Sequence, residues 1–185
     1  MSYKWIKKNH LSPKESSFYY FAYGSCMCPV DLKRTMGEMI HPYFVGIGIL
    51  PGYRLGFHRY SPTRKCGVLD VVEDKISKVY GVLYQLPWRL STLLDKREGA
   101  PVAYCQKFVD IQVKDHLYQD VRTYVVTNKS KEEFAPDETY FHVVLRGAVT
   151  CGLPEEYCWF LFNHMYNLQR RKLIESEKSK TNRFL

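Results

Sequence analysis

The sequence lacks any run of apolar residues long enough to cross a membrane, which takes about 18 or more in succession. The uncharged stretch from Met39 to Tyr53 is shorter, and two prolines, three glycines and a histidine interrupt it. The first eight residues carry three lysines and lack the apolar core of a secretory signal. Because these absences argue against a membrane protein and against export, we expect a cytoplasmic protein.

Metal-binding and nucleotide-binding patterns are missing as well. The cysteines include no Cys-x-x-Cys pair, and the histidines include no closely spaced pair of the kind that holds zinc. The Gly46-x-Gly48 pair lacks the third glycine and the following helix of a dinucleotide-binding turn, so it predicts a strand with a close backbone approach. We expect no metal site and reduced thiols. The cysteines are Cys26, Cys28, Cys66, Cys105, Cys151 and Cys158, and the histidines are His10, His41, His58, His116, His142 and His164.

Acidic residues are scarce only at the two ends of the chain. The net charge of +8 comes from 27 basic and 19 acidic residues, but residues 15–169 hold 17 of each. The excess lies in residues 1–14 and 170–185, which carry +4 each. We therefore expect one balanced domain at 15–173, without a nucleic-acid surface, between basic tails at 1–14 and 174–185. Few large apolar residues follow Leu173, which predicts disorder there.

Short apolar segments bounded by glycine, proline or charge make up most of the chain, which is typical of strands. They predict strands at 17–23, 44–50, 55–60, 67–72, 78–86, 102–113 and 121–126. Helical spacing and capping residues predict helices at 29–36, 88–97, 136–151 and 154–172. Successive strands without intervening helices favour an α+β fold, with a mixed, mostly antiparallel sheet that curls into a small barrel with flanking helices.

The segment Tyr23–Pro29 joins the first predicted strand to the first predicted helix through a Gly-Ser turn. Backbone N–H groups in such a turn, together with the partial positive charge of a helix start, suit an anion such as a carboxylate. Gly24 allows a ligand to approach the backbone closely. The segment is therefore a candidate anion site, and an ordinary tight turn is the alternative.

Glu98 lies at the end of the predicted helix 88–97, directly before Gly99. The helix dipole disfavours a carboxylate at this end, and burial raises the pKa of a carboxyl group further. A raised pKa suits a general base that works near neutral pH. From the residues alone, the alternative is a solvated glutamate beside Arg97.

Three motifs, taken in order, resemble the γ-glutamylcyclotransferase family. They are a Tyr-Gly-Ser loop at 23–25, a Leu-Asp-x-x-Glu-Gly motif at 94–99 followed by Tyr104, and Tyr140 followed by a Gly-Leu-Pro-x-x-Tyr motif at 152–157. The segment 79–84 before the acidic motif is similar to the family too. The resemblance covers residues 18–168, nearly the whole predicted domain.

This resemblance implies an enzyme of amidine-lyase or acyltransferase type that acts on a small γ-glutamyl amide, as a monomer or homodimer. In that family the substrate's α-amine attacks its own γ-carbonyl and releases 5-oxoproline, with no metal or organic cofactor. The resemblance makes Glu98 the general acid/base. Cys26 stands where the family usually has asparagine, whose amide both donates and accepts hydrogen bonds. The residues that it implies for substrate binding are Tyr23, Gly24, Ser25, Cys26, Met27, Tyr104 and Tyr140.

Two other functions remain open at this point. The loss of the family asparagine at Cys26 motivates a non-catalytic protein of the same fold that binds a γ-glutamyl or similar acidic head group. Retention of Glu98 favours catalysis, because a buried carboxylate without a partner is costly and gives a pure binder little. The basic tails could instead attach an adaptor to a polyanion, which salt-dependent binding would reveal.

Overall fold

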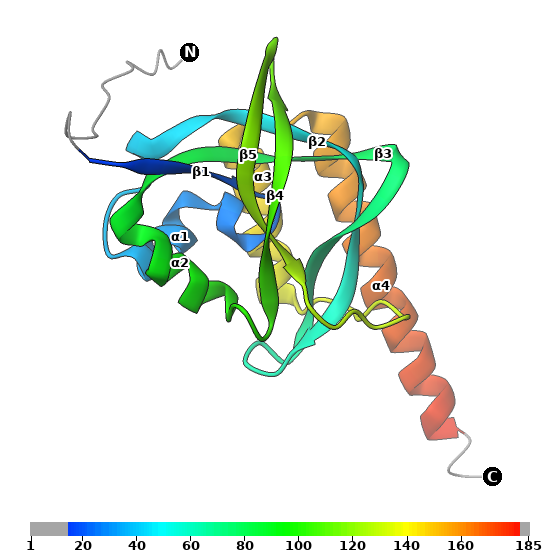
Figure 1. The fold of residues 1–185 in the computed structure, drawn as a ribbon. Helices are drawn as coiled ribbons and strands as arrows, with labels where there is room; N and C mark the ends of the chain where they lie inside the picture. Colours follow the sequence, from blue (N-terminus) through cyan, green and yellow to red (C-terminus); the bar gives the residue numbers. More distant parts are fainter. Residues whose placement is uncertain (1–14, 182–185) are drawn as a thin grey trace.

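A computed structural model describes residues 15–181, which form a closed five-stranded barrel with four α-helices (Figure 1). The order around the barrel is β1-β3-β2-β4-β5. This confirms the predicted α+β class and the mixed sheet curled into a barrel, whereas the predicted tail at 1–14 lies outside the described residues. The strands are β1 (Ser17–Ala22), β2 (Phe44–Ser61), β3 (Cys66–Pro87), β4 (Tyr104–Val113) and β5 (His116–Val126), and the helices are α1 (Pro29–Met36), α2 (Ser91–Glu98), α3 (Glu138–Cys151) and α4 (Glu155–Thr181).

One parallel pairing closes the barrel. β1 pairs antiparallel with β3 along its whole length and parallel with β5, where Tyr20 lies opposite Arg122. The other neighbouring strands pair antiparallel. The short strand β1 therefore lies between β3 and β5. At the C-terminal end of β1, the chain leaves the barrel.

The ring of Phe21 packs inside the barrel against glycines of two neighbouring strands. A Cβ atom on Gly48 of β2 would lie 3.1 Å from this ring, and one on Gly81 of β3 would lie 2.7 Å from it. The two glycines therefore let the fully buried ring contact the backbone. This is the close backbone approach predicted for the Gly46-x-Gly48 pair.

Two strands are longer than predicted. The segments at 44–50 and 55–60 form the single strand β2, and those at 67–72 and 78–86 form the single strand β3. Pro51 and Gly52, which suggested a strand end, lie at a register shift where residues 74–77 of β3 have no partner on β2. This irregularity accommodates the proline and the charged residues without ending either strand. The β4–β5 hairpin likewise extends β5 back to His116 from its predicted start at 121.

Each predicted helix is present, but α4 continues beyond its predicted end at 172 to Thr181. The prediction of disorder from 174 is therefore wrong as far as this residue. Residues 172–181 contain neither glycine nor proline, and the extension of an existing helix needs no new nucleus. The C-terminal part of α4 is exposed and projects from the body (Figure 1). Within residues 15–181, no helix is long and apolar enough to span a membrane.

Helices enclose the segment that connects β1 to α1. A 3₁₀ turn, η1 (Ser25–Met27), lies in this segment and packs against α1 and α3. α3 approaches it closely at Gly147, where a Cβ atom would lie 2.7 Å from the backbone nitrogen of Cys28. From the barrel, the Tyr84 hydroxyl donates a hydrogen bond to the Met27 carbonyl at 3.0 Å. The turn is therefore held from the helical side and from the barrel side.

Candidate functional site

A cavity of about 620 Å³ lies at the C-terminal end of β1, beside the C-terminus of α2. Loop residues 24–26 and Glu98 line it, together with residues of β2, β3, β4 and α3. Within the described chain, Glu98 is the one acidic side chain of the lining. The other titratable or cationic side chains of the lining are Tyr20, Tyr23, Cys26, Arg59, Arg64, Lys96, Arg97, Tyr104, Tyr124 and Tyr140.

The loop between β1 and α1 folds as the Gly-Ser and proline residues predict. α1 begins at Pro29, and the amides of Met27 and Cys28 donate to the carbonyls of Gly24 and Ser25 at 2.9 and 3.2 Å. The amides of residues 24–26 precede these two bonds, so they have no partner within the helical turn. Because the same three residues line the cavity, their amides are candidates for binding an anion there.

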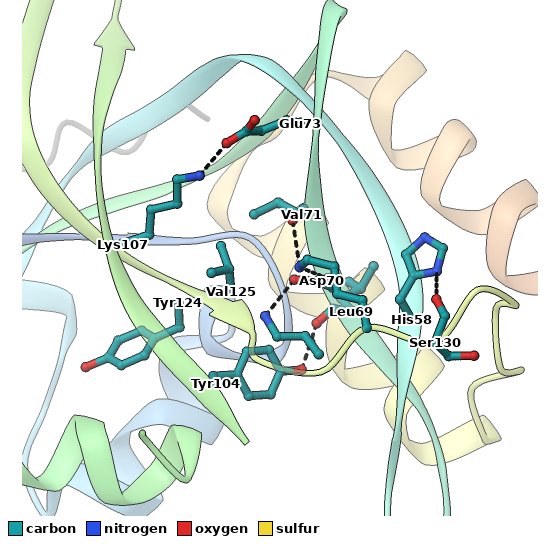
Figure 2. Close-up of polar contacts among 12 residues, drawn as sticks. His58, Leu69, Asp70, Val71, Glu73, Tyr104, Lys107, Tyr124, Val125 and Ser130 are labelled. Atoms are coloured by element: carbon teal, nitrogen blue, oxygen red, sulfur yellow. Dashed lines mark hydrogen bonds and ion pairs between the residues drawn. The ribbon is translucent and has the colours of Figure 1, made fainter. Parts of the chain in front are cut away.

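The backbone of Leu69 on β3 is held from two sides by cavity tyrosines. The Leu69 amide donates to the Tyr140 hydroxyl at 3.0 Å. The Tyr104 hydroxyl donates to the Leu69 carbonyl at 2.8 Å (Figure 2). A Cβ atom on Gly24 would lie 3.3 Å from the Tyr140 hydroxyl, so the loop backbone passes directly beside it. Burial raises the pKa of both tyrosines, which keeps their hydroxyls protonated.

Asp70, the next residue on β3, ties this wall to the end of β5. Its fully buried carboxylate accepts from the Val126 amide at 2.9 Å and pairs with the Lys129 ammonium, which also contacts the Val71 carbonyl (Figure 2). An ion pair that lies this deep is sensitive to the loss of either partner. The contacts connect β3, β5 and the following loop behind the cavity wall.

Glu98 is the last residue of α2, and Gly99 ends the helix with a φ of 64°. Its Oε1 atom accepts from the Cys26 thiol at 3.0 Å and from the Tyr20 hydroxyl at 3.3 Å. Burial raises the pKa of the carboxyl group, and the hydrogen bond from Cys26, the Arg97 charge and the hydrogen bond from Tyr20 oppose this rise. Glu98 is thus a carboxyl group with a raised pKa at the cavity wall, as a proton-transfer role requires.

The Cys26 thiol serves as a hydrogen-bonding group rather than as a thiolate. Burial and the neighbouring Glu98 carboxylate raise its pKa to about 12. The thiol is therefore protonated at neutral pH, whereas a cysteine nucleophile needs a lowered pKa. Its sulfur accepts from Arg97 Nε at 2.9 Å while its S–H donates to Glu98.

The structure brings most of the predicted site residues to one cavity. Met27 lies apart from it, because its side chain is fully buried in the core, and its carbonyl accepts hydrogen bonds from Tyr84 and Cys151. Tyr23 is held at the cavity by a hydrogen bond from its hydroxyl to the Tyr124 carbonyl at 2.6 Å. The predicted residues that line the cavity are Tyr23, Gly24, Ser25, Cys26, Glu98, Tyr104 and Tyr140.

Sequence reasoning missed several polar side chains of the cavity. Arg59 lies near the end of β2 and Arg64 in the turn between β2 and β3, and no motif in the sequence marks them. Arg97 had one signal, its position next to Glu98, but its partners on α1 lie more than 60 residues away. Tyr20 belongs to an aromatic strand in which the sequence does not distinguish core from cavity. Within the described residues, no cluster of His, Cys, Asp and Glu suits a metal ion.

Comparison with known proteins shows which family the chain resembles. The profile of the AIG2-like family matches residues 78–161, which include Glu98, Tyr104 and Tyr140. YkqA of Bacillus subtilis (strain 168) is 34% identical over 171 residues, which are 90% of this chain and 58% of YkqA. The crystal structure of YkqA matches with a TM-score of 0.74 and 32% identity, over 82% of this chain and 55% of that chain. In sequence and in fold, the chain is similar to the AIG2-like family.

Other relatives of this AIG2-like chain carry the name gamma-glutamylcyclotransferase. The protein of that name from Homo sapiens is 28% identical over 160 residues, which are 81% of this chain and 80% of the human protein. A solved structure named gamma-glutamyl cyclotransferase matches with a TM-score of 0.72 and 25% identity, over 79% of this chain and 86% of that one. The AIG2-like chain therefore shares its barrel with these proteins, although it spans only 58% of the length of YkqA.

Proposed function

We propose that this AIG2-like protein is a cyclotransferase that cleaves a γ-glutamyl amide and releases 5-oxoproline. The observation that carries the proposal is the position of Glu98, the acidic side chain of the cavity, in contact with Cys26 of the loop that lines the same cavity. One carboxyl group beside an anion-binding backbone is the arrangement that such a reaction needs. Relatives named gamma-glutamylcyclotransferase support this reading.

In the proposed reaction, Glu98 moves a proton between two nitrogen atoms of the substrate. The substrate's α-ammonium group loses a proton to Glu98, and the resulting amine attacks the γ-carbonyl carbon. A new C–N bond closes the five-membered ring, and Glu98 returns the proton to the leaving nitrogen as its bond to carbon breaks. Glu98 then passes the second proton of the ring nitrogen to the released amine, which departs as an ammonium group. Because nucleophile and carbonyl belong to one molecule, positioning and one proton shuttle are sufficient.

The γ-glutamyl head group fits the loop side of the cavity. We place its α-carboxylate on the amides of Gly24, Ser25 and Cys26, because backbone donors suit an anion whatever the side chain. The hydroxyls of Tyr104 and Tyr140 fix the adjoining wall, beside Gly24, through the backbone of Leu69. Cys26 leaves this binding mode intact, since its thiol, and not its amide, is directed to Glu98.

The leaving side of the substrate meets cationic side chains. The guanidinium groups of Arg59 and Arg64 lie over the rings of Tyr104 and Tyr140, at 5.7 and 5.2 Å from their centroids. Glu98 is the one acidic side chain of the described lining, and Arg64 also lies 4.0 Å from Asp31, which is outside that lining. We therefore favour substrates in which the leaving amine carries a carboxylate. The proposal also includes a cytoplasmic site of action and places the whole activity in residues 15–173.

A panel of γ-glutamyl amides, assayed for 5-oxoproline by chromatography, tests this function. The panel contains amides of an amino acid, of a peptide and of an uncharged amine, and reactions without protein correct for spontaneous ring closure. Release of 5-oxoproline, fastest from the carboxylate-bearing amides, is expected. Binding of the amides without release would indicate the non-catalytic alternative, and neither binding nor release would refute both.

A further inference from the structure

The Arg97 guanidinium is directed at α1 and at the loop before it, although the residue directly precedes the proposed base. Its Nε atom donates to Cys26 Sγ at 2.9 Å, and its terminal nitrogens donate to Thr35 Oγ1 and Asp31 Oδ2 at 2.5 Å each. The side chains of Arg97 and Asp31 are each only 12% exposed. Three donors of one planar fork are thus committed to a single neighbouring segment.

The Cys26 sulfur connects this fork to Glu98. It accepts a hydrogen bond from Arg97 and donates its own proton to Glu98 Oε1 at 3.0 Å. An asparagine side chain can accept and donate in the same two directions, so cysteine keeps this connectivity with a weaker donor and acceptor. The positive charge of Arg97 compensates for the weakness of sulfur as an acceptor, because charge-assisted hydrogen bonds are stronger than neutral ones.

We propose that Arg97 is a positioning residue that holds the Cys26 thiol against Glu98 and favours the ionised form of that carboxylate. The expected effect of Arg97 on the reaction rate rests on the proposed function, whereas its effect on the position and ionisation of Glu98 does not. Asp31 on α1 fixes the orientation of the Arg97 side chain. The contacts of Arg97 with Asp31 and Cys26 therefore hold the loop and the end of α2 in one relative position. Neither the family resemblance nor the motif at 94–99 assigns a role to Arg97.

Several other groups face Glu98 and contribute to its protonation. Burial raises its pKa most strongly, and Cys26, Arg97, Tyr20 and Arg64 lower it in that order. Of the two arginine charges that lower this pKa, that of Arg97 has the larger effect. The groups that face Glu98 are Tyr20 and Tyr23 from the end of β1, Cys26 from η1, Arg64 from the turn after β2, Tyr104 from β4, Tyr140 from α3, and Arg97 from α2 itself.

Two substitutions separate the charge of Arg97 from its shape. Arg97→Gln removes the positive charge, whereas Arg97→Lys keeps the charge and loses the planar fork. Arg34→Gln is the matched control, because Arg34 approaches the same Asp31 at 4.0 Å but is 72% exposed. The first measurement is the pH dependence of kcat and kcat/KM with the γ-glutamyl amide that the panel identifies as the fastest substrate.

The proposal predicts that Arg97→Gln moves the acid limb of kcat/KM to higher pH, because a neutral residue no longer favours ionised Glu98. On the alkaline plateau, kcat falls by about tenfold or more with little change in KM, because the base is misplaced. Arg97→Lys keeps the acid limb near that of the wild type, and Arg34→Gln changes neither parameter. If both Arg97 variants lose activity equally and the limb stays in place, Arg97 is only structural and the proposal is wrong.

A second measurement does not depend on catalysis. The pKa of Glu98 is followed by carbon-13 NMR of labelled glutamate, and Glu98→Gln identifies its signal. Arg97→Gln is expected to raise this pKa, Cys26→Ala to raise it by removing the thiol donor, and Cys26→Ser to restore it. Three results together would overturn the proposal. They are that Cys26→Ala and Cys26→Ser titrate alike, that Arg97→Lys leaves the Glu98 pKa unchanged, and that Arg97→Gln either also leaves it unchanged or does not fold. If no γ-glutamyl amide is turned over, these titrations still decide the role of Arg97, so the two failures are distinguishable.

Discussion

Gly147→Ala tests whether the contact between α3 and the loop positions the site. The added Cβ atom would lie 2.7 Å from the Cys28 nitrogen and 3.0 Å from the Met27 carbonyl carbon, and both are backbone atoms. To reach the 3.4 Å at which ordinary contacts begin, the loop and the helix must separate by about 0.7 Å. This displacement moves the amides of residues 24–26 relative to Glu98.

The two consequences of Gly147→Ala differ in size. Alanine gains about 1 kcal/mol of helix propensity over glycine, and overpacking costs about 1–3 kcal/mol, so the net loss of stability is at most about 2 kcal/mol. Misplacement by nearly an ångström lowers kcat/KM by about 100-fold. Val149→Ala is the control, because Val149 lies on the same helix but is 61% exposed.

Urea unfolding and the 5-oxoproline assay measure both effects on the same preparations. Gly147→Ala is expected to lose far more activity than its loss of stability explains, whereas Val149→Ala keeps its activity. If Gly147→Ala retained kcat/KM within about threefold, less than 1 kcal/mol of barrier, the loop would not be positioned by this contact, and the reasoning would be refuted.

Three further substitutions, and a fourth that serves as a comparison, test individual groups by urea unfolding. Glu98→Gln is expected to raise the unfolding free energy at pH 8. Burial raises the pKa of Glu98, so its ionised form lowers the stability of the folded protein above that pKa. This loss is about 1.4 kcal/mol for each unit by which the pKa is raised. This gain disappears below pH ~4, where the carboxyl is protonated in both states, and a loss at pH 8 would contradict the raised pKa. Tyr140→Phe leaves a buried β3 amide without its acceptor, at a cost of about 1–3 kcal/mol, and an unchanged midpoint would exclude that bond as a contributor. Lys129→Met leaves the fully buried Asp70 carboxylate without its partner and is expected to cost about 1–3 kcal/mol, after allowing for water at the partly exposed ammonium. Lys107→Met removes a surface ion pair with Glu73 that is worth less than about 1 kcal/mol. Equal losses of stability in the two variants would refute the expected difference between the buried and the surface pair.

The order of the helices and most of the strands could be predicted because glycine and proline mark their ends. Pro29 begins α1, Gly37 ends it, and Gly99 ends α2. The same rule misplaced the boundary at Pro51, because an irregularity in the β2–β3 ladder absorbs that residue without ending the strand. Local rules cannot detect this, since the partner strand determines whether a proline ends pairing or is accommodated.

The candidate site was predictable where chemistry is concentrated in short motifs. The loop at 23–25 and the Glu98-Gly99 pair are local signals, and the structure brings them to one cavity. Arg59 and Arg97 reach the cavity only through tertiary contacts, so their roles required the structure. The extension of α4 beyond 172 was missed because low apolar content suggested disorder, whereas propagation of a packed helix needs no apolar face of its own.

The central claim is that Glu98 shuttles the proton in the release of 5-oxoproline. The most direct measurement compares the wild-type protein and Glu98→Gln at pH 8, with the γ-glutamyl amide that the wild type turns over fastest. Glutamine keeps the size and one acceptor oxygen for Cys26 and Tyr20 but cannot carry a proton between the two nitrogens. The account predicts a folded variant whose kcat is lower by about 100-fold to 10,000-fold; 5-oxoproline release within about tenfold of the wild type, roughly 1.4 kcal/mol of barrier, would contradict it.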